Sequence, residues 1–192
     1  MAAVSIISEE VLSSKKYPLK YITFEKPDSE GVMQQQAKEV YYRPDAVAVL
    51  IVDEERMKFL LCRQFRLPTF VNGNETGYLV EVCAGLMDEN ETPEQTVLRE
   101  AKEETGYTLA ELSPVAGTYT SAGGITEFVH LFIGSCSLNG DNPGAGGLKD
   151  EGEDIELLEL GFEEARTMLK QGEFHDMKTI LLLQHYFMQL EY

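Results

Sequence analysis

The sequence predicts an α/β (α+β) fold, a sandwich in which helices cover a mixed β-sheet. Three observations lead to this class. Short apolar runs typical of strands surround one sharply bounded helix, and the last predicted helix is apolar on one side. The chain has 192 residues, of which 43% are hydrophobic and 26% charged, so it is long enough for a real core.

The expected strands fall into an N-terminal group and a main group. Residues 1–44 are predicted to form a strand-rich N-terminal segment, with strands at 19–25 and 37–42, and residues 45–192 to form the main domain. Main-domain strands are expected at 46–52, 59–65, 78–82, 112–118, 128–135 and 155–160. Loops are expected at 68–77 and 121–127, and in the Gly-rich, acidic stretch 139–154.

The most sharply delimited helix begins after Thr92, a good N-cap residue. Pro93 suits the first helical position, and Gln95 completes a capping box with Thr92. Gly106 supplies the C-terminal stop, so both ends of this helix are specified by local sequence. Two further helices are predicted at 162–171 and 178–190.

Acidic residues outnumber basic ones by 33 to 16, which gives a formal net charge of -17. A chain this acidic, with no local basic patch, does not grip a nucleic-acid backbone, so no nucleic-acid partner is expected. The excess carboxylates have two readings, a solvated surface and a converging set that holds divalent cations. Both can hold at once, because a few carboxylates suffice for a cation.

The cysteine pattern and the hydropathy indicate where in the cell the protein is expected. Cys62, Cys83 and Cys136 form no CxxC pair, so neither a zinc site nor a disulfide framework is expected. Residues 1–17 lack the apolar core of a signal peptide, and no apolar stretch is long enough to span a bilayer. We therefore expect a cytoplasmic protein without a membrane partner.

Three carboxylates share one face of the helix after Thr92, because Glu100, Glu103 and Glu104 stand at positions i, i+3 and i+4. Arg99 can pair with Glu103 but cannot neutralise all three charges. A hard divalent cation would relieve the repulsion, and oxygen ligands suit Mg²⁺ or Mn²⁺. Without further context, three glutamates on a helix most often form a solvated surface. The surrounding sequence therefore has to distinguish such a surface from a cation site.

That pattern, at residues 85–107, resembles the signature box of the Nudix hydrolases. The matching positions are Gly85, Glu91, Arg99, Glu100, Glu103, Glu104 and Gly106. The resemblance implies a Nudix fold, an α/β/α sandwich around a mixed β-sheet. It also implies that Glu100, Glu103 and Glu104 hold Mg²⁺.

The same resemblance gives roles to the neighbours of these glutamates. It implies that the carbonyl of Ala84 adds a metal ligand, that Arg99 orients the glutamates, and that Glu91 braces the loop. Arg99, Glu100 and Glu104 are therefore expected among the catalytic residues. Gly85 and Leu86 are expected to contact the substrate.

The flanks of the box resemble the ADP-ribose and nucleotide-sugar pyrophosphatase branch of the family. The matching stretches are 64–66, 71–75, 83–86, 123–127, 154–156 and 178–183. This resemblance implies cleavage of the diphosphate in a nucleoside-diphosphate sugar, with GDP-mannose giving GMP and mannose 1-phosphate. ADP-ribose, giving AMP and ribose 5-phosphate, is the alternative substrate. A non-catalytic protein that senses a nucleotide is the alternative from another class.

The branch implies further site residues outside the box. Glu127 is expected to be a catalytic, substrate-contacting carboxylate in a loop, and either Glu151 or Glu153 to join the metal site. Arg66 is read evenly as a phosphate ligand or as a surface salt bridge, since a guanidinium suits both. Lys178 is expected near the sugar phosphate.

The N-terminal segment is expected to take part in a homodimer. The resemblance implies that Tyr17, Lys38 and Glu39 approach the nucleotide, reaching over from a partner subunit. It implies in turn that residues 1–44 lie in the dimer interface.

Overall fold

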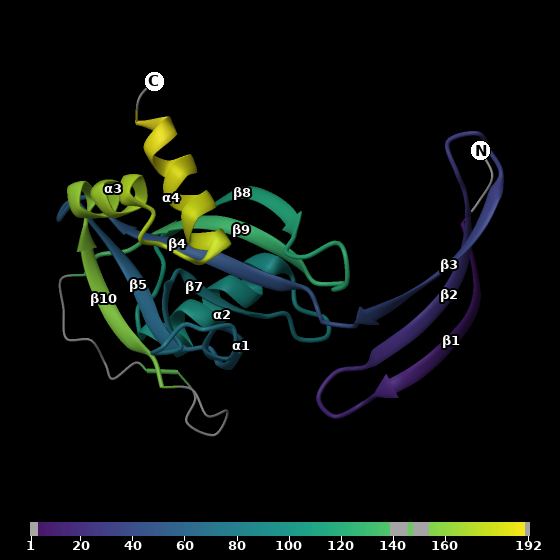
Figure 1. Ribbon diagram of the computed structural model, residues 1–192. Coiled ribbons are helices and arrows are strands. Elements are labelled where there is room, and N and C mark those ends of the chain that lie inside the picture. The colour runs from purple at the N-terminus through teal and green to yellow at the C-terminus, as the bar shows by residue number, and fades with distance from the viewer. Residues whose placement is uncertain (1–3, 139–145, 148–153, 191–192) are drawn as a thin grey trace. The chain divides into compact units, whose positions relative to one another are not determined.

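The computed structural model describes residues 4–138, 146–147 and 154–190 (Figure 1). The chain forms two compact units. The first contains Met1–Asp45 and Thr118–Val129, and the second contains Ala46–Gly117 and His130–Tyr192. The described helices all belong to the second unit.

A three-stranded antiparallel sheet makes up most of the first unit. Its strands are β1 (Ser5–Ser13), β2 (Leu19–Pro27) and β3 (Met33–Tyr41), in the order β1-β2-β3 (Figure 1). β1 was not among the predicted strands. All of its residues except the last are exposed, so no alternation of apolar and polar positions marks it in the sequence.

A mixed sheet of seven strands forms the centre of the second unit. The strand order is β10-β5-β4-β9-β8, while β6 pairs with β5 and β7 pairs with β4. The strands are β4 (Ala46–Asp53), β5 (Lys58–Phe65), β6 (Tyr78–Glu81), β7 (Cys83–Leu86), β8 (Glu111–Tyr119), β9 (Phe128–Ser135) and β10 (Glu156–Gly161). β4 is buried along its whole length, as its continuous apolar sequence predicts.

Helix α2 (Pro93–Thr105) covers one face of this sheet (Figure 1). Val47 and Val49 of β4 share a core cluster with Val97 and Ala101 of α2. Alternate residues of a strand point to opposite faces, so the intervening apolar residues of β4 serve the other face. This double burial explains why β4 reads as an unbroken apolar run.

Helices α3 (Phe162–Gln171) and α4 (Met177–Gln189) cover the opposite face (Figure 1). The Phe59 ring lies 4.5 Å from that of Phe162 and 5.1 Å from that of Tyr186, measured between centroids. Helices on both faces make the α/β/α sandwich that the sequence predicts. None of the helices in the described part of the chain is long and apolar enough to cross a membrane.

The predicted caps of α2 are confirmed. The Thr92 side chain accepts a hydrogen bond from the Gln95 backbone at 3.3 Å, and the Gln95 side chain accepts one from the Thr92 backbone at 2.9 Å. Gly106 ends the helix with φ 73°, a left-handed conformation that glycine adopts without strain. These local contacts fix where the acidic face of α2 begins and ends.

The loop predicted at 68–77 is wrong for its first residues, because the single-turn helix α1 (Leu67–Val71) occupies them. Pro68 favours such a turn, since its fixed φ suits the start of a helix and its missing N–H is not needed there. The predicted loop 139–154 lies mostly outside the described residues.

Candidate active site

Arg99 stands at the centre of an acidic cluster on α2. Its Nη1 donates to carboxylate oxygens of Glu100 and Glu103, each at 2.9 Å. Its Nε and Nη2 each donate to one oxygen of Glu91 at 3.0 Å, and Nη2 also donates to the Leu86 carbonyl at 3.2 Å. One guanidinium thus orients three carboxylates and ties α2 to the end of β7.

Hydrogen bonds from Arg99, and then from Thr96, lower the pKa of Glu91 to about 2. In return, Glu91 is the main reason why the pKa of Arg99 lies above its ordinary value. The Thr96 hydroxyl donates to Glu91 at 2.9 Å. Glu91 therefore stays ionised and holds the loop before α2 against the helix, which is the bracing role expected for it.

Glu104 faces the sheet and is only 2% exposed. Its Oε2 accepts hydrogen bonds from the Ala84 backbone N–H at 3.2 Å and from the Cys62 thiol at 3.7 Å. Burial, together with the charge of Glu104, raises the pKa of Cys62 well above its ordinary value. The thiol therefore stays protonated and remains a donor to the carboxylate.

Gly85 provides space for Glu100. A Cβ atom at Gly85 would overlap the Glu100 carboxylate. Gly85 lies on β7, paired with Val47 of the fully buried β4, so its backbone cannot easily move away. The approach of the Glu100 carboxylate to β7 thus requires a residue without a side chain at this position.

The chemistry of this donor set fits a hard divalent cation. Glu100, Glu103 and Glu104 offer carboxylate oxygens on α2, and Ala84, whose N–H contacts Glu104, also carries a backbone carbonyl. Arg99 contributes the positive charge of a single guanidinium, so the cluster keeps an excess of negative charge. No three His, Cys, Asp or Glu side chains of the described residues are already gathered as ligands around one point. Instead, Glu100 and Glu103 contact Arg99, and Glu104 contacts the backbone of β7.

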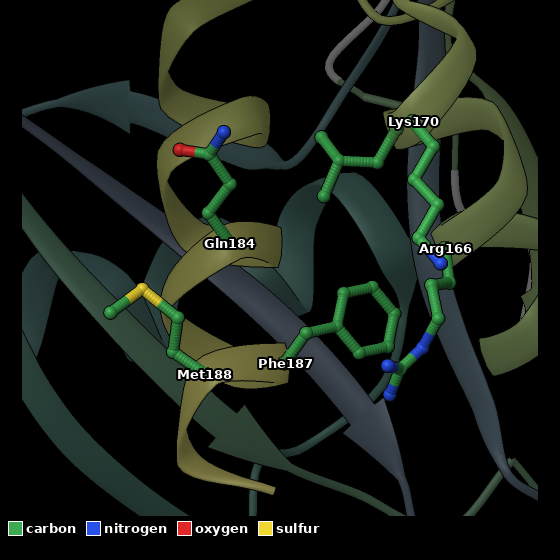
Figure 2. A pocket seen from close by; sticks show the side chains of 6 residues that line it. Arg166, Lys170, Gln184, Phe187 and Met188 are labelled. Carbon is green, nitrogen blue, oxygen red and sulfur yellow. The ribbon is translucent and has the colours of Figure 1, made fainter. Parts of the chain in front are cut away.

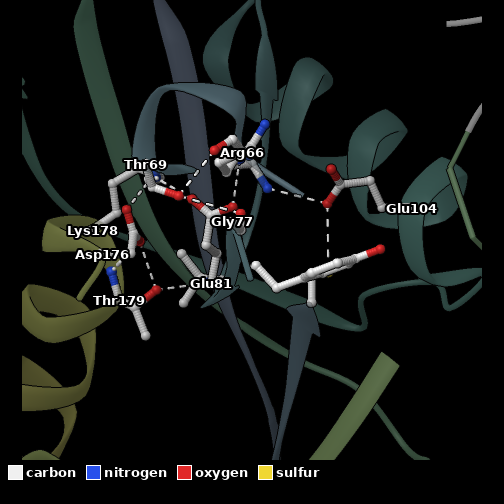
Figure 3. Close-up of polar contacts among 12 residues, drawn as sticks. Arg66, Thr69, Gly77, Glu81, Glu104, Asp176, Lys178 and Thr179 are labelled. Atoms are coloured by element: carbon white, nitrogen blue, oxygen red, sulfur yellow. Dashed lines mark hydrogen bonds and ion pairs between the residues drawn. The ribbon is translucent and has the colours of Figure 1, made fainter. Parts of the chain in front are cut away.

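A second group of charges surrounds Glu81, the last residue of β6 (Figure 3). Its Oε2 accepts a hydrogen bond from Arg66 Nε at 2.7 Å, and its Oε1 lies 3.6 Å from Lys178 Nζ. The Glu81 side chain is only 4% exposed, whereas that of Arg66 is 38% exposed. The predicted phosphate ligands Arg66 and Lys178 thus meet on one buried carboxylate.

The start of α4 anchors Lys178. Its Nζ donates to Asp176 Oδ1 at 2.6 Å, and Asp176 Oδ2 accepts hydrogen bonds from the backbone N–H and the hydroxyl of Thr179. The Thr179 hydroxyl accepts in turn from the Val82 backbone N–H at 2.8 Å. Asp176 is thus the N-cap of α4, and the contact with Val82 joins the helix to the strand end that carries Glu81.

Cys62 lies between the two groups. It is the cross-strand partner of Glu81 on β5 and β6, and its thiol donates to Glu104. Directly opposed residues of antiparallel strands point to the same face of a sheet. The acidic cluster on α2 and the group of charges around Glu81 therefore lie next to each other on the face that α2 covers.

The first unit holds Glu127 by two side chains. Arg43 Nε donates to Glu127 Oε2 at 3.3 Å, and the Thr120 hydroxyl donates to Oε1 at 3.2 Å. The Arg43 guanidinium also lies 4.9 Å from the centre of the Tyr17 ring. Two predicted site residues, Tyr17 and Glu127, are thereby brought together through Arg43.

Lys38 and Glu39 lie on β3 and are exposed. They pair with Ile22 and Tyr21 of β2 in the antiparallel register. Within the described part of this unit, neither side chain is hydrogen-bonded or ion-paired to Tyr17 or Glu127. The predicted metal residues Glu151 and Glu153 lie outside the described residues.

An opening of about 400 Å³ lies elsewhere, between α3 and α4 (Figure 2). It is lined by Arg166, Leu169, Lys170, Gln184, Phe187 and Met188. The Arg166 guanidinium packs 4.6 Å from the centre of the Phe187 ring. None of the predicted site residues lines this opening.

Sequence reasoning did not single out Glu81 or Arg43 as site residues. Glu81 reads as one polar residue near the end of a strand, and Arg43 as an isolated basic residue before Pro44. The only available signal for Glu81 was a carboxylate at the buried end of an otherwise apolar strand, which requires a partner. Nothing local in the sequence linked Arg43 to Glu127.

Comparisons with known proteins show what the whole chain is similar to. The sequence profile of the NUDIX domain matches residues 42–183. The GDP-mannose pyrophosphatases of Shigella flexneri and of Escherichia coli O157:H7 are each 41% identical to the chain over 182 residues, which cover 95% of this chain and 94% of theirs. A crystal structure of an ADP compounds hydrolase matches with a TM-score of 0.72 and 18% identity, over 100% of this chain and 96% of that chain. At this identity the likeness concerns the fold alone, and it confirms the predicted sandwich.

Proposed function

The chain belongs to the Nudix hydrolase family, and on this basis we propose that it hydrolyses the diphosphate of a nucleoside-diphosphate sugar with the help of Mg²⁺. The proposed substrate is GDP-mannose, and the products are GMP and mannose 1-phosphate. The likeness to GDP-mannose pyrophosphatases over nearly the whole chain supports this substrate. Mn²⁺ is an alternative cation, because it accepts the same oxygen ligands.

The observation that carries the proposal is the cluster around Arg99. Glu100 and Glu103 are oriented by one guanidinium, and Glu104 is buried beside the Ala84 backbone. Such an excess of carboxylate oxygens on one helix face is stabilised by a hard cation. When bound, Mg²⁺ offsets the negative charge of a diphosphate and promotes the ionisation of water. We propose Glu100, Glu103, Glu104 and the Ala84 carbonyl as its ligands.

Other residues of the chain bind the substrate and move a proton. Arg66 and Lys178 receive the negative oxygens of the diphosphate, for which a guanidinium and an ammonium are suited. The oxygen of water attacks one phosphorus, the phosphoanhydride bond breaks, and the leaving phosphate keeps the electron pair. Glu127 is the base proposed to take the proton from water, because a carboxylate can accept it. Arg43 and Thr120 fix the orientation of this carboxylate within the first unit.

The proposed function is tested by product analysis. Purified protein is incubated with GDP-mannose, ADP-ribose and UDP-glucose, each with Mg²⁺ or with EDTA, and the products are separated by chromatography. Mg²⁺-dependent GMP and mannose 1-phosphate, formed faster than the other products, support the proposal. Preferred cleavage of ADP-ribose would keep the mechanism and change the substrate. Binding of GDP-mannose without any cleavage would favour a nucleotide sensor instead.

We also propose that the protein acts as a homodimer through residues 1–44. The strand β1 supports this, because Ile6, Ile7 and Val11 are all exposed on it. An exposed strand with apolar side chains is a ready surface for pairing with another chain. Light scattering of the intact protein should give twice the mass of 21.5 kDa. A mass of one chain would contradict the dimer.

A cytoplasmic location is proposed as well. Cys62, Cys83 and Cys136 are free and buried, and unpaired thiols are usual in a reducing compartment. Fractionation of cells that produce a tagged form should recover the protein with cytoplasmic markers. Recovery with the membrane or outside the cell would contradict this location.

A further inference from the structure

Glu81 is a buried carboxylate that bridges two cations. It accepts a hydrogen bond from Arg66 at 2.7 Å and lies 3.6 Å from Lys178. Removing a carboxylate from water is unfavourable unless charged and hydrogen-bonding partners replace the solvent. Arg66 and Lys178 together provide those partners, so the three side chains form one interdependent unit.

The cations of this unit are less buried than the carboxylate. The Glu81 side chain is 4% exposed, that of Lys178 is 19% exposed and that of Arg66 is 38% exposed. Glu81 engages Nε of Arg66, which is one of five N–H donors on a guanidinium. The carboxylate therefore holds both cations from the interior while each keeps a part that a ligand can reach.

Without Glu81, the two cations would repel each other and would lose their shared anchor. The carboxylate offsets this repulsion and fixes the direction of the Arg66 guanidinium, since Nε is the donor it engages. Lys178 is fixed a second time by Asp176 at 2.6 Å. Nε of Arg66 lies only 2.7 Å from Glu81 Oε2, so this contact helps to set the orientation of the guanidinium.

We propose that Glu81 is a positioning residue that sets Arg66 and Lys178 to receive the diphosphate of the substrate. This inference rests on the proposed function. The place of the unit supports it, because Cys62 pairs with Glu81 across the strands and donates to Glu104 of the acidic cluster. A diphosphate held by Arg66 would thus lie beside the carboxylates proposed to bind the metal. Glu81 itself contacts neither substrate nor metal in this arrangement.

The test is steady-state hydrolysis of GDP-mannose by the wild-type protein and by Glu81→Gln, which keeps the side-chain shape and removes the charge. We expect KM to rise by about 10-fold, as for other supporting residues behind a ligand-binding shell. We expect kcat to stay within about threefold, because loss of binding common to ground and transition states raises KM alone. Unchanged KM in Glu81→Gln would overturn the inference.

A matched control comes from Glu159. This carboxylate also bridges an arginine and a lysine, Arg56 at 2.8 Å and Lys58 at 2.6 Å, and it lies outside the proposed site. Glu159→Gln should leave KM and kcat as in the wild type. An equal rise of KM in both variants would show a general effect of charge and would overturn the specific role of Glu81.

A double-mutant cycle separates positioning from mere structural support. In an Arg66→Ala background, Glu81→Gln should raise KM much less than it does in the wild type, because the guanidinium that Glu81 orients is already absent. Fully additive effects would contradict the inference.

If Glu81→Gln does not fold, Glu81→Asp serves instead, since it keeps the charge but withdraws the oxygens, and KM should again rise. Wild-type protein that cleaves no nucleotide sugar would refute the proposed function, whereas active wild type with unaltered Glu81 variants would refute this inference alone.

Discussion

The substitution Arg99→Ala removes the common donor of the acidic cluster while leaving its carboxylates in place. Glu100 and Glu103 then lose hydrogen bonds of 2.9 Å and face each other on one side of α2. Like charges on a helix face repel, and the contact that ties α2 to the Leu86 carbonyl is lost as well. We expect a less stable protein whose glutamates are poorly oriented.

The magnitude follows from the contacts with Glu100 and Glu103. A hydrogen bond to a charged group contributes about 1.5–3 kcal/mol when sheltered and an exposed ion pair about 0.2–1 kcal/mol. The Arg99 side chain is 27% exposed, so screening by solvent reduces the sheltered value. About 1 kcal/mol for each of the two carboxylates gives about 2 kcal/mol in total. For a chain of this size that is a fall in Tm of about 4–8 °C.

The assay is urea unfolding in EDTA, followed by circular dichroism, with thermal unfolding as a second measure. Arg63→Ala is the matched control, because the Arg63 side chain is 40% exposed and, among the described residues, contacts Glu156 by a salt bridge and the Tyr78 ring at 4.5 Å. The control should lose about 1 kcal/mol, the sum of an exposed ion pair and an exposed cation–π contact. Equal losses for Arg99→Ala and Arg63→Ala would refute the view that Arg99 organises the cluster.

Three further predictions concern Gly85, Glu91 and Thr179. Gly85→Ala places a Cβ on the Glu100 carboxylate, so kcat should fall about 100-fold with an unchanged circular dichroism spectrum, as for other small displacements of catalytic groups; wild-type kcat would contradict the close approach. Glu91 has a folded pKa of about 2 against an ordinary 4.5, so its contribution is complete above pH 4.5 and is lost as the pH falls toward 2. Unfolding curves of Glu91→Gln should therefore lose less stability across that window than those of the wild type, and parallel profiles would contradict the shift. Thr179→Val leaves the buried Val82 N–H without its 2.8 Å acceptor, so urea unfolding should show a loss of about 1–3 kcal/mol, and an unchanged midpoint would contradict it.

Elements with strong local signals were predicted well from the sequence. Thr92, Pro93, Gln95 and Gly106 define both ends of α2, because caps act within a few residues. The spacing of the glutamates on α2 then follows from helix geometry alone. The acidic face and its contact with Arg99 could therefore be derived before any tertiary structure was known.

Elements whose formation depends on distant partners were missed or shortened. The strand β1 has no buried face, and only its pairing with β2 defines it. The helix α1 is a single turn whose N-cap residue Arg66 makes no side-chain capping contact, so its Gly- and Asn-rich surroundings read as a loop.

The site shows the same division. Arg99 and its partners are near in sequence, whereas Arg43 meets Glu127 across 84 positions and Thr179 meets Val82 across 97. No periodicity in the sequence encodes such contacts, because they arise from the packing of separate elements. Glu81 was overlooked as a site residue for this reason, although its burial at a strand end required a charged partner.

The central claim is that the carboxylates of α2 hold the cation needed to cleave a nucleotide sugar. The most direct measurement is the rate of GMP release from GDP-mannose by the wild type, Glu104→Gln and Glu94→Gln, each with Mg²⁺ and with EDTA. Glu94 lies on the same helix but is exposed and outside the cluster, so its variant is the matched control. We expect Mg²⁺-dependent release by the wild type and Glu94→Gln, and almost none by a folded Glu104→Gln. Wild-type release by Glu104→Gln, or equal rates in EDTA, would contradict it.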